Sequence, residues 1–259
     1  MSISIERLFR FPVKGLRGEE LNYTELNVDE AFAHDRRFAF AIRPEALDAE
    51  RPTWVSFDHF ISMKSMGRMT ATQAAFAPET RKLTLTHAGV PVAVNVDDTG
   101  AAARLVGYMR SALGDAAPAT LAFVEIAHGS FSDQARDLVS LINLATVRAI
   151  EAQAGMALDP LRFRGNIYVD GLAPWAEFDL IGATLQVGDT SLRVLERIDR
   201  CRATNFDPFQ GVEDVNLPLL LRKIYGHIDC GVFLHVERGG RVAVGDAMII
   251  AGGSDQRQV

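Results

Sequence analysis

Alternation of apolar and polar positions runs through much of the chain and predicts β-strands. In RFAFAIRP, Phe38, Phe40 and Ile42 stand two residues apart, so a strand would place them on one face. In KLTLTHAGVPVAVNV, two alternating runs flank Gly89, which predicts two strands joined by a turn. We therefore expect a chain made mostly of strands.

Two segments in the C-terminal half carry hairpin signals. ATLQVGDTSLRVLE alternates on both sides of a Gly188-Asp189 turn. GVFLHVERGGRVAVGDAMII repeats the pattern around Gly239-Gly240. Because short turns of this kind join antiparallel strands, these segments predict hairpins and not βαβ units.

Three segments change to a helical period. The first, DDTGAAARLVGYMRSALG, has Leu105, Met109 and Leu113 at helical spacing. We expect Asp98 to be its N-cap and Gly114 to end it. This segment predicts a helix with one apolar face.

Asparagines open the other two predicted helices. NLPLLLRKIYG begins at Asn216 and ends at Gly226, and NLATVRAIEAQAG begins at Asn143 and ends at Gly155. The free N–H groups at a helix start carry partial positive charge, which suits a phosphate. From the residues alone, Asn143 is either a simple N-cap or a cap whose helix also faces an anion.

Together these elements predict a mainly β (α+β) fold that is barrel-like, with a few helices. No internal repeat, low-complexity tract or Pro/Ser-rich linker interrupts the chain. The segment GDAAPAT, residues 114–120, is the best candidate for a boundary. We therefore predict two domains, residues 1–117 and 118–259.

The composition is that of an ordinary folded protein and narrows the choice of partners. The 259 residues are 48% hydrophobic and 23% charged, with a formal net charge of -6. Binding to nucleic acid or anionic membranes requires basic surface, so we expect neither, and any anion site must be local. No apolar run is long enough for a membrane span, and MSISIERLFR lacks the features of a signal peptide. We expect a cytoplasmic protein whose two cysteines remain thiols.

The common catalytic and metal-binding motifs are absent from the sequence. It contains no G-x-x-x-x-G-K-[ST] loop, no G-x-G-x-x-G after a strand, no H-E-x-x-H and no C-x-x-C. Its six histidines are scattered, with no pair at i, i+3 or i+4. Nucleotide-dependent and zinc-dependent functions are therefore not indicated.

A thiol lies among basic residues in the segment RIDRCRATNFDP. Cys201 stands between Arg200 and Arg202, with Arg197 upstream. An ordinary thiol has a pKa of about 8.5, and nearby guanidinium groups favour its anionic form. A thiolate in such a setting can be a nucleophile, a persulfide carrier or a soft metal ligand. Cys230, in HIDCGVFLHV, opens an apolar strand and is expected to be a core residue.

Other segments carry basic residues beside glycine or at the start of a predicted strand, a pattern suited to binding an anion. They are Lys14 and Gly15 in FPVKGLRG, Arg36 and Arg37 in AHDRRFAF, and Arg164, Gly165 and Asn166 in RFRGNIYVDG. Each alone is compatible with a solvated charge. Combined with the cysteine segment, they form a more specific pattern.

This set of fragments, in this order, resembles the MOSC family, named after the C-terminal region of molybdenum cofactor sulfurases, preceded by its N-terminal β-barrel domain. The resemblance extends from about Ile5 to Ile250, and the segment RCRATNFDP matches an R-C segment followed by T-x-x-D-P. It is similar above all to proteins that reduce amidoximes and other N-hydroxylated compounds. The resemblance implies a MOSC-type β-barrel in residues 118–259 and a smaller β-barrel-like domain in residues 1–117.

The resemblance also implies a molybdenum cofactor, a molybdopterin whose metal takes one cysteine ligand from the protein. Cys201 would be that metal ligand, with Arg200 and Asp199 beside it as catalytic residues. The implied cofactor-binding residues are Lys14, Gly15, Arg36, Asn143, Ala145, Arg164, Asn166 and Thr204. A soft thiolate suits molybdenum, and lysine, arginine and helix N–H groups suit a phosphate.

Three positions depart from the family pattern. The usual R-P-N is R-G-N at 164–166, the D-P-D-T-G turn is DPFQG, and Asp199 replaces a serine common two residues before the cysteine. We expect Gly165 to change mainly the stiffness of the backbone. We expect the carboxylate of Asp199 to pair with an arginine or to change which substrates the site accepts.

The function implied is that of a molybdenum-dependent reductase acting on small N-hydroxylated substrates. The sequence has no C-x4-C-x2-C ferredoxin signature, so electrons would come from a separate donor protein of the ferredoxin or flavoprotein type. Two alternatives remain open. In one, Cys201 carries a persulfide and the chain is a sulfur carrier or transferase; in the other, the chain is a non-catalytic carrier of the molybdenum cofactor.

Overall fold

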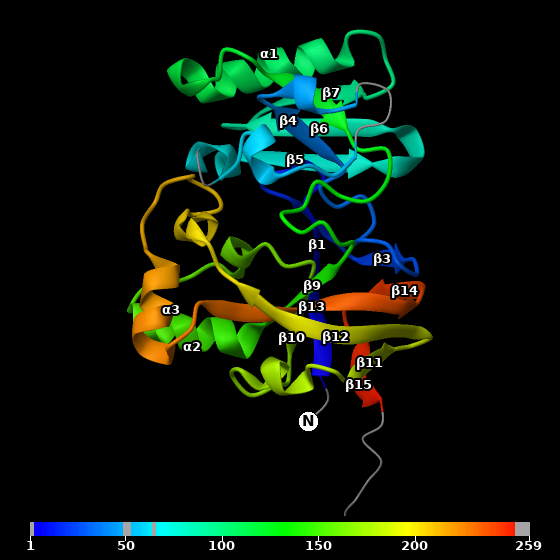
Figure 1. Cartoon of the computed structure of the whole chain (residues 1–259), viewed down its shortest axis with the longest axis vertical. Helices are drawn as coiled ribbons and strands as arrows, with labels where there is room; N and C mark the ends of the chain where they lie inside the picture. Colours follow the sequence, from blue (N-terminus) through cyan, green and yellow to red (C-terminus); the bar gives the residue numbers. More distant parts are fainter. Residues whose placement is uncertain (1–2, 49–52, 64–65, 252–259) are drawn as a thin grey trace, which may run out of the picture.

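Seven strands close into a β-barrel in the computed structural model, which describes residues 3–48, 53–63 and 66–251 (Figure 1). The order around the barrel is β10-β9-β13-β12-β11-β15-β1, and β1 pairs with β10 to close it. β9 and β10 are parallel, and every other neighbouring pair is antiparallel. The strands are β1 (Ile3–Arg10), β9 (Val139–Asn143), β10 (Ile167–Asp170), β11 (Thr184–Val187), β12 (Thr190–Asp199), β13 (Asp229–Arg238) and β15 (Ala247–Ala251). The fold is mainly β, as the sequence predicts.

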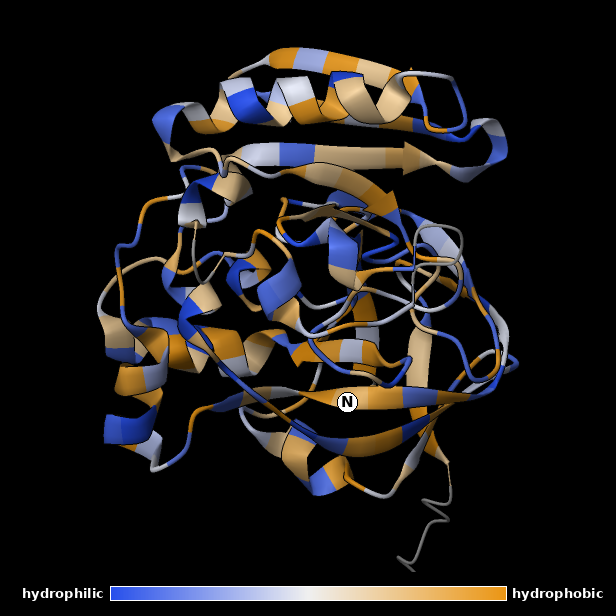
Figure 2. Ribbon diagram, turned by 45° about the horizontal axis from the view of Figure 1, so that its top comes forward, coloured by the Kyte–Doolittle hydropathy of each residue, from blue (hydrophilic) through white to orange (hydrophobic). Residues whose placement is uncertain are grey.

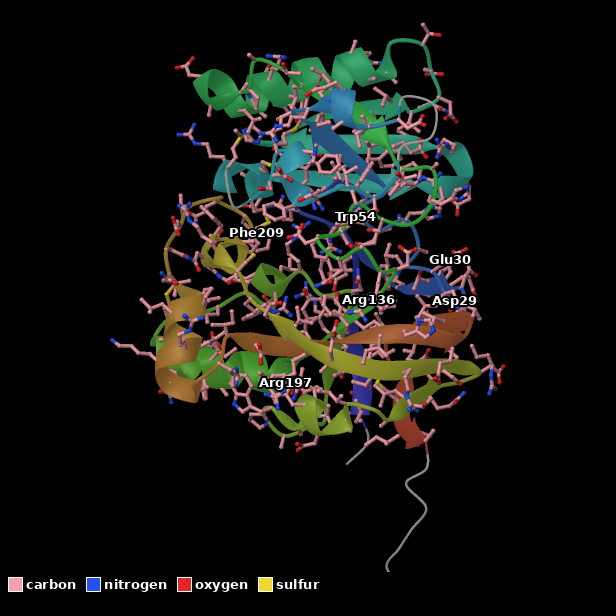
Figure 3. All side chains as sticks on the ribbon, in the orientation of Figure 1. Asp29, Glu30, Trp54, Arg136, Arg197 and Phe209 are labelled. Atoms are coloured by element: carbon pink, nitrogen blue, oxygen red, sulfur yellow. The ribbon has the colours of Figure 1, made fainter. Side chains whose placement is uncertain are left out.

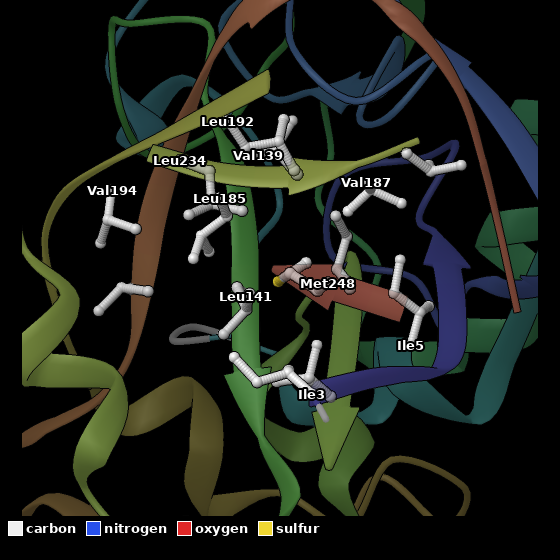
Figure 4. Packing of buried hydrophobic residues seen from close by; sticks show 14 of the residues in the cluster. Ile3, Ile5, Val139, Leu141, Leu185, Val187, Leu192, Val194, Leu234 and Met248 are labelled. Atoms are coloured by element: carbon white, nitrogen blue, oxygen red, sulfur yellow. The ribbon is translucent and has the colours of Figure 1, made fainter. Parts of the chain in front are cut away.

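Aliphatic side chains fill the inside of the barrel (Figure 4). Along β12, Leu192 and Val194 are buried and Arg193 between them is exposed, which is the period of two expected for a strand with one core face. The predicted Gly188-Asp189 hairpin is confirmed, because β11 and β12 pair on either side of that turn. Full burial of one such aliphatic side chain contributes about 1.5–3 kcal/mol, so the barrel core is a main source of stability.

The first strand of the chain belongs to the barrel. β1 pairs with β15 at Ile3↔Met248 and with β10 at Leu8↔Ile167. The short strand β2 (Glu19–Leu21) extends the sheet beside β1. The division into residues 1–117 and 118–259 stays a prediction, and in space β1 lies with the second of these parts.

A smaller unit of strands occupies the other end of the molecule, with one helix lying over it (Figure 1). One antiparallel sheet has the order β5-β6-β7, and β4 pairs with β8. The elements are β4 (Phe38–Ala41), β5 (Thr72–Ala77), β6 (Lys82–His87), β7 (Val90–Asn95), α1 (Ala101–Leu113) and β8 (Ala122–Glu125). The two strands predicted around Gly89 are therefore confirmed as β6 and β7.

The alternation predicted for residues 38–42 is also confirmed. Phe38 and Phe40 are buried in the core between these strands and α1, and Ile42 packs against it. Ala39 and Ala41 point to the opposite side, into a small cluster of their own. β4 is thus buried on both faces, and its two phenylalanines pack in the core of the smaller unit.

Two of the predicted helix starts are confirmed, and the third is corrected. The asparagines Asn143 and Asn216 are the N-caps of α2 (Leu144–Ala154) and α3 (Leu217–Tyr225). α1 begins after Gly100, and Asp98 contributes only its carbonyl oxygen, which accepts the N–H of Ala101. Figure 2 shows α1 with apolar and polar residues alternating along it, as a helix with one buried face requires.

The predicted hairpin around Gly239-Gly240 is wrong. β14 (Gly240–Ala243) follows β13 directly in sequence, but it pairs with β3 (Tyr23–Leu26). Both edges of β13 are already occupied, by β12 on one side and β9 on the other. β14 must therefore find its hydrogen-bonding partner elsewhere.

Helices long and apolar enough to cross a membrane do not occur among the residues that the structure describes.

Candidate functional site

A cavity of about 340 Å³ lies between the barrel and the N-terminal part of the chain. Nine of the sequence-predicted site residues line it: Lys14, Gly15, Arg36, Arg164, Asn166, Asp199, Arg200, Cys201 and Thr204. The residues come from segments far apart in the sequence. The fold therefore brings the predicted anion-binding fragments and the predicted thiol to one place.

Lys14 is a deeply buried cation of the cavity. Its side chain is buried, and its Nζ donates to the carbonyl of Phe131 at 2.7 Å and to Oδ1 of Asp133 at 2.6 Å. Burial lowers the pKa of Lys14, and the neighbouring carboxylate of Asp133 opposes that shift. Gly15, beside it, has φ +81, and a Cβ there would lie 2.7 Å from Cε of Met69.

Arg36 and Arg164 lie against the same aromatic ring. The Cζ atoms of their guanidinium groups are 5.2 Å and 4.2 Å from the ring centroid of Phe11. Arg36 pairs with Asp35 and also donates to the carbonyl of Arg164 at 3.3 Å. Burial, with Arg36 close by, lowers the pKa of Arg164 to about 9, so Arg164 remains charged at neutral pH.

Both arginines hold a backbone conformation that side chains other than glycine rarely adopt. Arg36 has φ 48 and Arg164 has φ 49, in the left-handed region. Such conformations cost on the order of 1 kcal/mol each, so the surrounding contacts must hold them. The backbone at Arg36 is held by its own N–H, which donates to Phe11, and by its carbonyl, which accepts from Phe131.

Several buried polar atoms at the cavity have no hydrogen-bond partner. Among the described residues, the buried side-chain atoms without a partner are Nη2 of Arg164, Nε of Arg162, Oγ of Ser130 and Oγ1 of Thr190. Arg164, Arg162 and Ser130 line the cavity. Because an unpartnered buried donor costs about 1–3 kcal/mol, these atoms fit a site that receives a ligand with hydrogen-bond acceptors.

Cys201 is partly exposed at the cavity, where strand β12 ends and a short turn begins. Thr204 closes this turn, because its N–H and its Oγ1 both donate to the carbonyl of Cys201, at 3.1 Å and 3.0 Å. The side chain of Cys201 is not needed for these bonds. Thr204 therefore orients the thiol through the backbone.

The arginines around Cys201 do not surround its thiol as the sequence suggests. Arg200 is buried, and its guanidinium donates to the carbonyls of Cys230 and Phe163. Arg202 is exposed and pairs with Glu213. The segment turns after Asp199 instead of continuing as a strand, so neighbours in sequence separate in space.

The remaining basic neighbour also lies elsewhere. Arg197 stacks on the ring of Phe178 at 4.3 Å and lies 3.8 Å from Asp229. Asp199 is exposed, lines the cavity, and has no ion-pair partner among the residues described, so the expected pairing with an arginine is not found. Its carboxylate remains available to a ligand.

Cys230 is fully buried in an apolar cluster, as predicted. Burial raises the pKa of its thiol to about 12, so it stays protonated at neutral pH. The two cysteines are both free thiols. Only Cys201 reaches the cavity.

Asn166 joins three strands at the wall of the cavity. Its Oδ1 accepts from the N–H and the Oγ of Ser140 on β9, and its Nδ2 donates to the carbonyl of Phe9 on β1. Most of its hydrogen-bonding capacity is therefore used within the protein. Asn166 therefore links β9 and β1 through its side-chain hydrogen bonds, and it also lines the cavity.

Gly165 has a steric role that the sequence did not reveal. A Cβ at this position would lie 2.3 Å from Cγ1 of Ile142, and the N–H of Gly165 donates to the hydroxyl of Tyr168 at 3.0 Å. A proline would lose that bond and collide with Ile142. The expectation that Gly165 affects mainly stiffness is thus corrected: the glycine makes room for Ile142.

The structure does not bring Asn143 and Ala145 to the cavity. Ser140, at the start of β9, lines the cavity, whereas Asn143 ends that strand and caps α2. Asn143 accepts the N–H of Ala145 and donates to the carbonyl of Ala173 and to the buried carboxylate of Glu177. The start of α2 is therefore used by the protein itself.

Several residues of the cavity were missed by sequence reasoning. Arg162, Ser130, Asp133 and Arg136 line it, together with the half-exposed ring of Phe57. Three of them lie in HGSFSDQARD, a polar segment whose Gly, Ser and Asp content is typical of a loop. Figure 3 labels Arg136 and Trp54, which mark this region between the barrel and the upper sheet.

Metal binding by side chains alone is not indicated. Within residues 3–48, 53–63 and 66–251, no group of three or more His, Cys, Asp or Glu side chains is arranged to hold a metal ion. A single cysteine can serve only where other ligands come with the metal, as in a dithiolene cofactor. The donor set at Cys201 fits that type of metal centre.

Comparison with protein families identifies the barrel. Residues 128–249 match the sequence model of the MOSC domain. The chain contains a MOSC domain. This domain supplies Cys201, Arg164 and Asn166, whereas Lys14 and Arg36 come from the residues before it. No curated protein matches the chain.

Solved structures similar to this chain are themselves distant in sequence. YuaD from Bacillus subtilis is 13% identical, with 96% of this chain and 94% of that chain covered and a TM-score of 0.46. YiiM from Geobacillus stearothermophilus is 17% identical over 43% of this chain and 53% of that chain, with a TM-score of 0.35. YiiM from Escherichia coli is 18% identical over 45% and 55%, with a TM-score of 0.32.

Replacing Gly165 should destabilise the protein through Ile142. We expect Gly165→Ala to lower the free energy of unfolding by about 1–3 kcal/mol, the usual cost of overpacking. In Gly165→Ala/Ile142→Ala, the combined loss should be smaller than the sum of the two single losses, because the contact is gone. Denaturant unfolding measures this cycle. Gly107→Ala, in α1 with open space around its Cβ, is the control and should not destabilise. Strict additivity would contradict the steric role.

The buried carboxylate of Glu177 should make stability depend on pH. Burial raises its pKa in the folded protein, so the folded state favours the protonated form and stability from this group falls as pH rises above about 4.3. The stability of the wild type relative to Glu177→Gln should therefore decrease between about pH 4 and pH 8. Thermal unfolding across this range is the measurement, with the exposed Glu45→Gln as control. A difference that stays constant with pH would contradict the assignment.

Proposed function

We propose that the cavity binds a molybdenum cofactor and that the chain reduces N-hydroxylated compounds with electrons from a separate donor protein. The observation that carries the proposal is one cavity lined both by the partly exposed Cys201 and by three cations, the buried Lys14 and the partly buried Arg36 and Arg164. Membership of the MOSC domain family is consistent with a function related to this cofactor. The specific reaction follows from the resemblance of the cysteine segment to amidoxime-reducing proteins.

The basic end of the cavity fits the phosphate of the cofactor. Arg164 keeps its Nη2 without a partner, and Ser130 does the same with its Oγ. A phosphate oxygen is an acceptor that suits both groups, and hydrogen bonds to a charged partner are roughly twice as strong as neutral ones. Lys14 and Arg36 add the positive charge that an anionic group requires in an otherwise acidic protein.

The thiol end of the cavity fits the metal. Molybdenum in a dithiolene cofactor prefers a soft ligand, and Cys201 is the cysteine whose side chain reaches the cavity. When bound, the cofactor supplies the two-electron chemistry by which an N–O bond is broken. Thr204 holds the Cys201 backbone in place, and the buried Arg200 fixes the segment by its bonds to the Cys230 and Phe163 carbonyls.

Asp199 is the side chain best placed to handle protons. Reduction of a hydroxylamine or amidoxime consumes two electrons and two protons, cleaves the N–O bond and releases water. Asp199 is exposed at the cavity, so its carboxylate can exchange protons with solvent and pass them to a bound substrate. Arg200 helps to position the segment, because its guanidinium is occupied by backbone carbonyls.

Analysis of the purified protein tests the cofactor directly. Protein expressed in a host that makes molybdopterin should contain molybdenum and pterin in nearly equal amounts. With a chemical reductant in place of the donor protein, it should convert an amidoxime to the amidine. Protein without metal and pterin would contradict the proposal. A mass gain of one sulfur on Cys201 without metal would favour a persulfide carrier, and bound cofactor without turnover would favour a carrier of the cofactor.

Serine substitutions at the two cysteines should have different effects: one should abolish activity and the other should lower stability. Cys201→Ser should abolish reductase activity, since a hydroxyl is a harder and less acidic ligand than a thiol. It should retain part of the pterin, because Lys14, Arg36 and Arg164 bind the phosphate independently. Cys230→Ser should keep activity and lower stability by roughly 1–3 kcal/mol, the cost of a hydroxyl in an apolar cluster.

The measurements for this pair are metal content, turnover and melting temperature. Full turnover with normal molybdenum in Cys201→Ser would show that another group holds the metal. Loss of turnover in Cys230→Ser at unchanged melting temperature would show that the assignment of the two thiols is wrong.

A further inference from the structure

The three cations at the basic end of the cavity have two carboxylates beside them. Arg36 pairs with Asp35, and Lys14 pairs with Asp133. Arg164 donates to the carbonyl of Leu16 and keeps a buried Nη2 without a partner. The cluster therefore carries about one positive charge more than its own carboxylates balance. To balance an anion that carries two negative charges, one of these carboxylates must move away from its cation.

Asp35 cannot leave without disturbing the fold. Its side chain is 4% exposed, and its Oδ1 accepts the backbone N–H of Phe11 at 2.7 Å. Phe11 in turn supplies the ring on which both arginines lie. Asp35 is thus a fixed part of the site.

Asp133 is placed differently. Its side chain is 53% exposed, although the Lys14 side chain that it contacts is only 6% exposed. It lies on the segment 132–136, which lines the cavity and which we call the strap. The strap follows the buried Phe131, whose ring packs on Phe60 at 4.8 Å. A carboxylate on this segment can turn to solvent while Phe131 stays in the core.

Other contacts hold the strap independently of Lys14. The indole Nε1 of Trp54 donates to the carbonyl of Ser132 at 3.0 Å, and Arg136 pairs with the exposed Glu196. The strap therefore does not depend on Asp133 alone for its position. Removing the charge of Asp133 leaves these two contacts in place.

We propose that Asp133 is an exchangeable counter-ion that occupies Lys14 until an anionic ligand group displaces it. The carboxylate satisfies a buried ammonium that would otherwise be unpaired, which is strongly unfavourable. It also competes with the incoming anion, so each binding event replaces the Lys14 to Asp133 contact by a Lys14 to ligand contact. The proposal uses the anion site of the proposed function, but neither its metal nor its reaction.

Calorimetric titration with inorganic phosphate, at constant ionic strength, tests the competition. Asp133→Asn keeps a hydrogen-bond acceptor for Lys14 but removes the charge. Phosphate should bind this variant about fivefold more tightly than the wild type, which corresponds to the roughly 1 kcal/mol of a half-exposed ion pair. Equal or weaker binding by Asp133→Asn would overturn the proposal, and so would a complete lack of phosphate binding in both proteins.

Two control variants separate competition from other effects. Glu196→Gln cuts the other ionic tether of the strap and leaves Asp133 in place. Asp199→Asn removes a charge from the cavity lining without freeing Lys14. Neither should reproduce the gain. A fivefold gain in Glu196→Gln would indicate strap mobility, and one in Asp199→Asn would indicate general electrostatics; either result overturns the proposal.

A double-mutant cycle with Lys14 gives the decisive comparison. In a Lys14→Met background, which keeps most of the length of the side chain but removes its charge, Asp133→Asn should produce no gain in phosphate affinity. A gain that persists without Lys14 would overturn the proposal. Because the ligand is phosphate alone, a protein that lacks molybdenum or reductase activity could still show this exchange, so the two proposals can fail separately.

Discussion

The pairing of β1 with β10 is the constraint on which both the barrel and the cavity depend. It closes the seven-stranded barrel, and it extends beyond the strands through the hydrogen bond from the N–H of Phe9 to the carbonyl of Asn166. The residues after β1 and those before β10 therefore leave the barrel at the same place. Phe11 and Lys14 come from the first segment and Arg164 from the second, although about 150 residues separate them along the chain.

This closure places positive charge in a region that has little access to water. Burying a charge is unfavourable unless it is paired, and each of the three cations is stabilised by a different kind of partner. Arg36 has a fixed carboxylate, Lys14 an exposed one, and Arg164 a carbonyl and the face of Phe11. Together with the left-handed backbone at both arginines, this arrangement is consistent with the anion site that we propose.

Around Cys201, closeness in sequence does not predict which charged groups lie near the thiol. Three arginines lie within four residues of Cys201, yet the structure directs one to backbone carbonyls, one to Glu213 and one to Phe178. What keeps Cys201 accessible is the end of β12 and the turn closed by Thr204. The start of α2 likewise differs from what its local sequence suggests. Asn143 accepts the N–H of Ala145 and donates to the carboxylate of Glu177, so its polar groups bond within the protein and not to a ligand.

The sequence by itself determined the features that depend on neighbours a few residues away: the alternation in β4, β6 and β12, the turns at Gly89 and Gly188, and the caps at Asn143 and Asn216. It also identified nine of the residues that line the cavity, because the fragments resemble a family. Only the tertiary structure decided that β14 pairs with β3, that Gly165 yields space to Ile142, and that Asp133 faces Lys14. Each of these depends on a contact between distant segments, whose geometry is set by barrel closure and by which strand edges are already paired, and no local pattern encodes it.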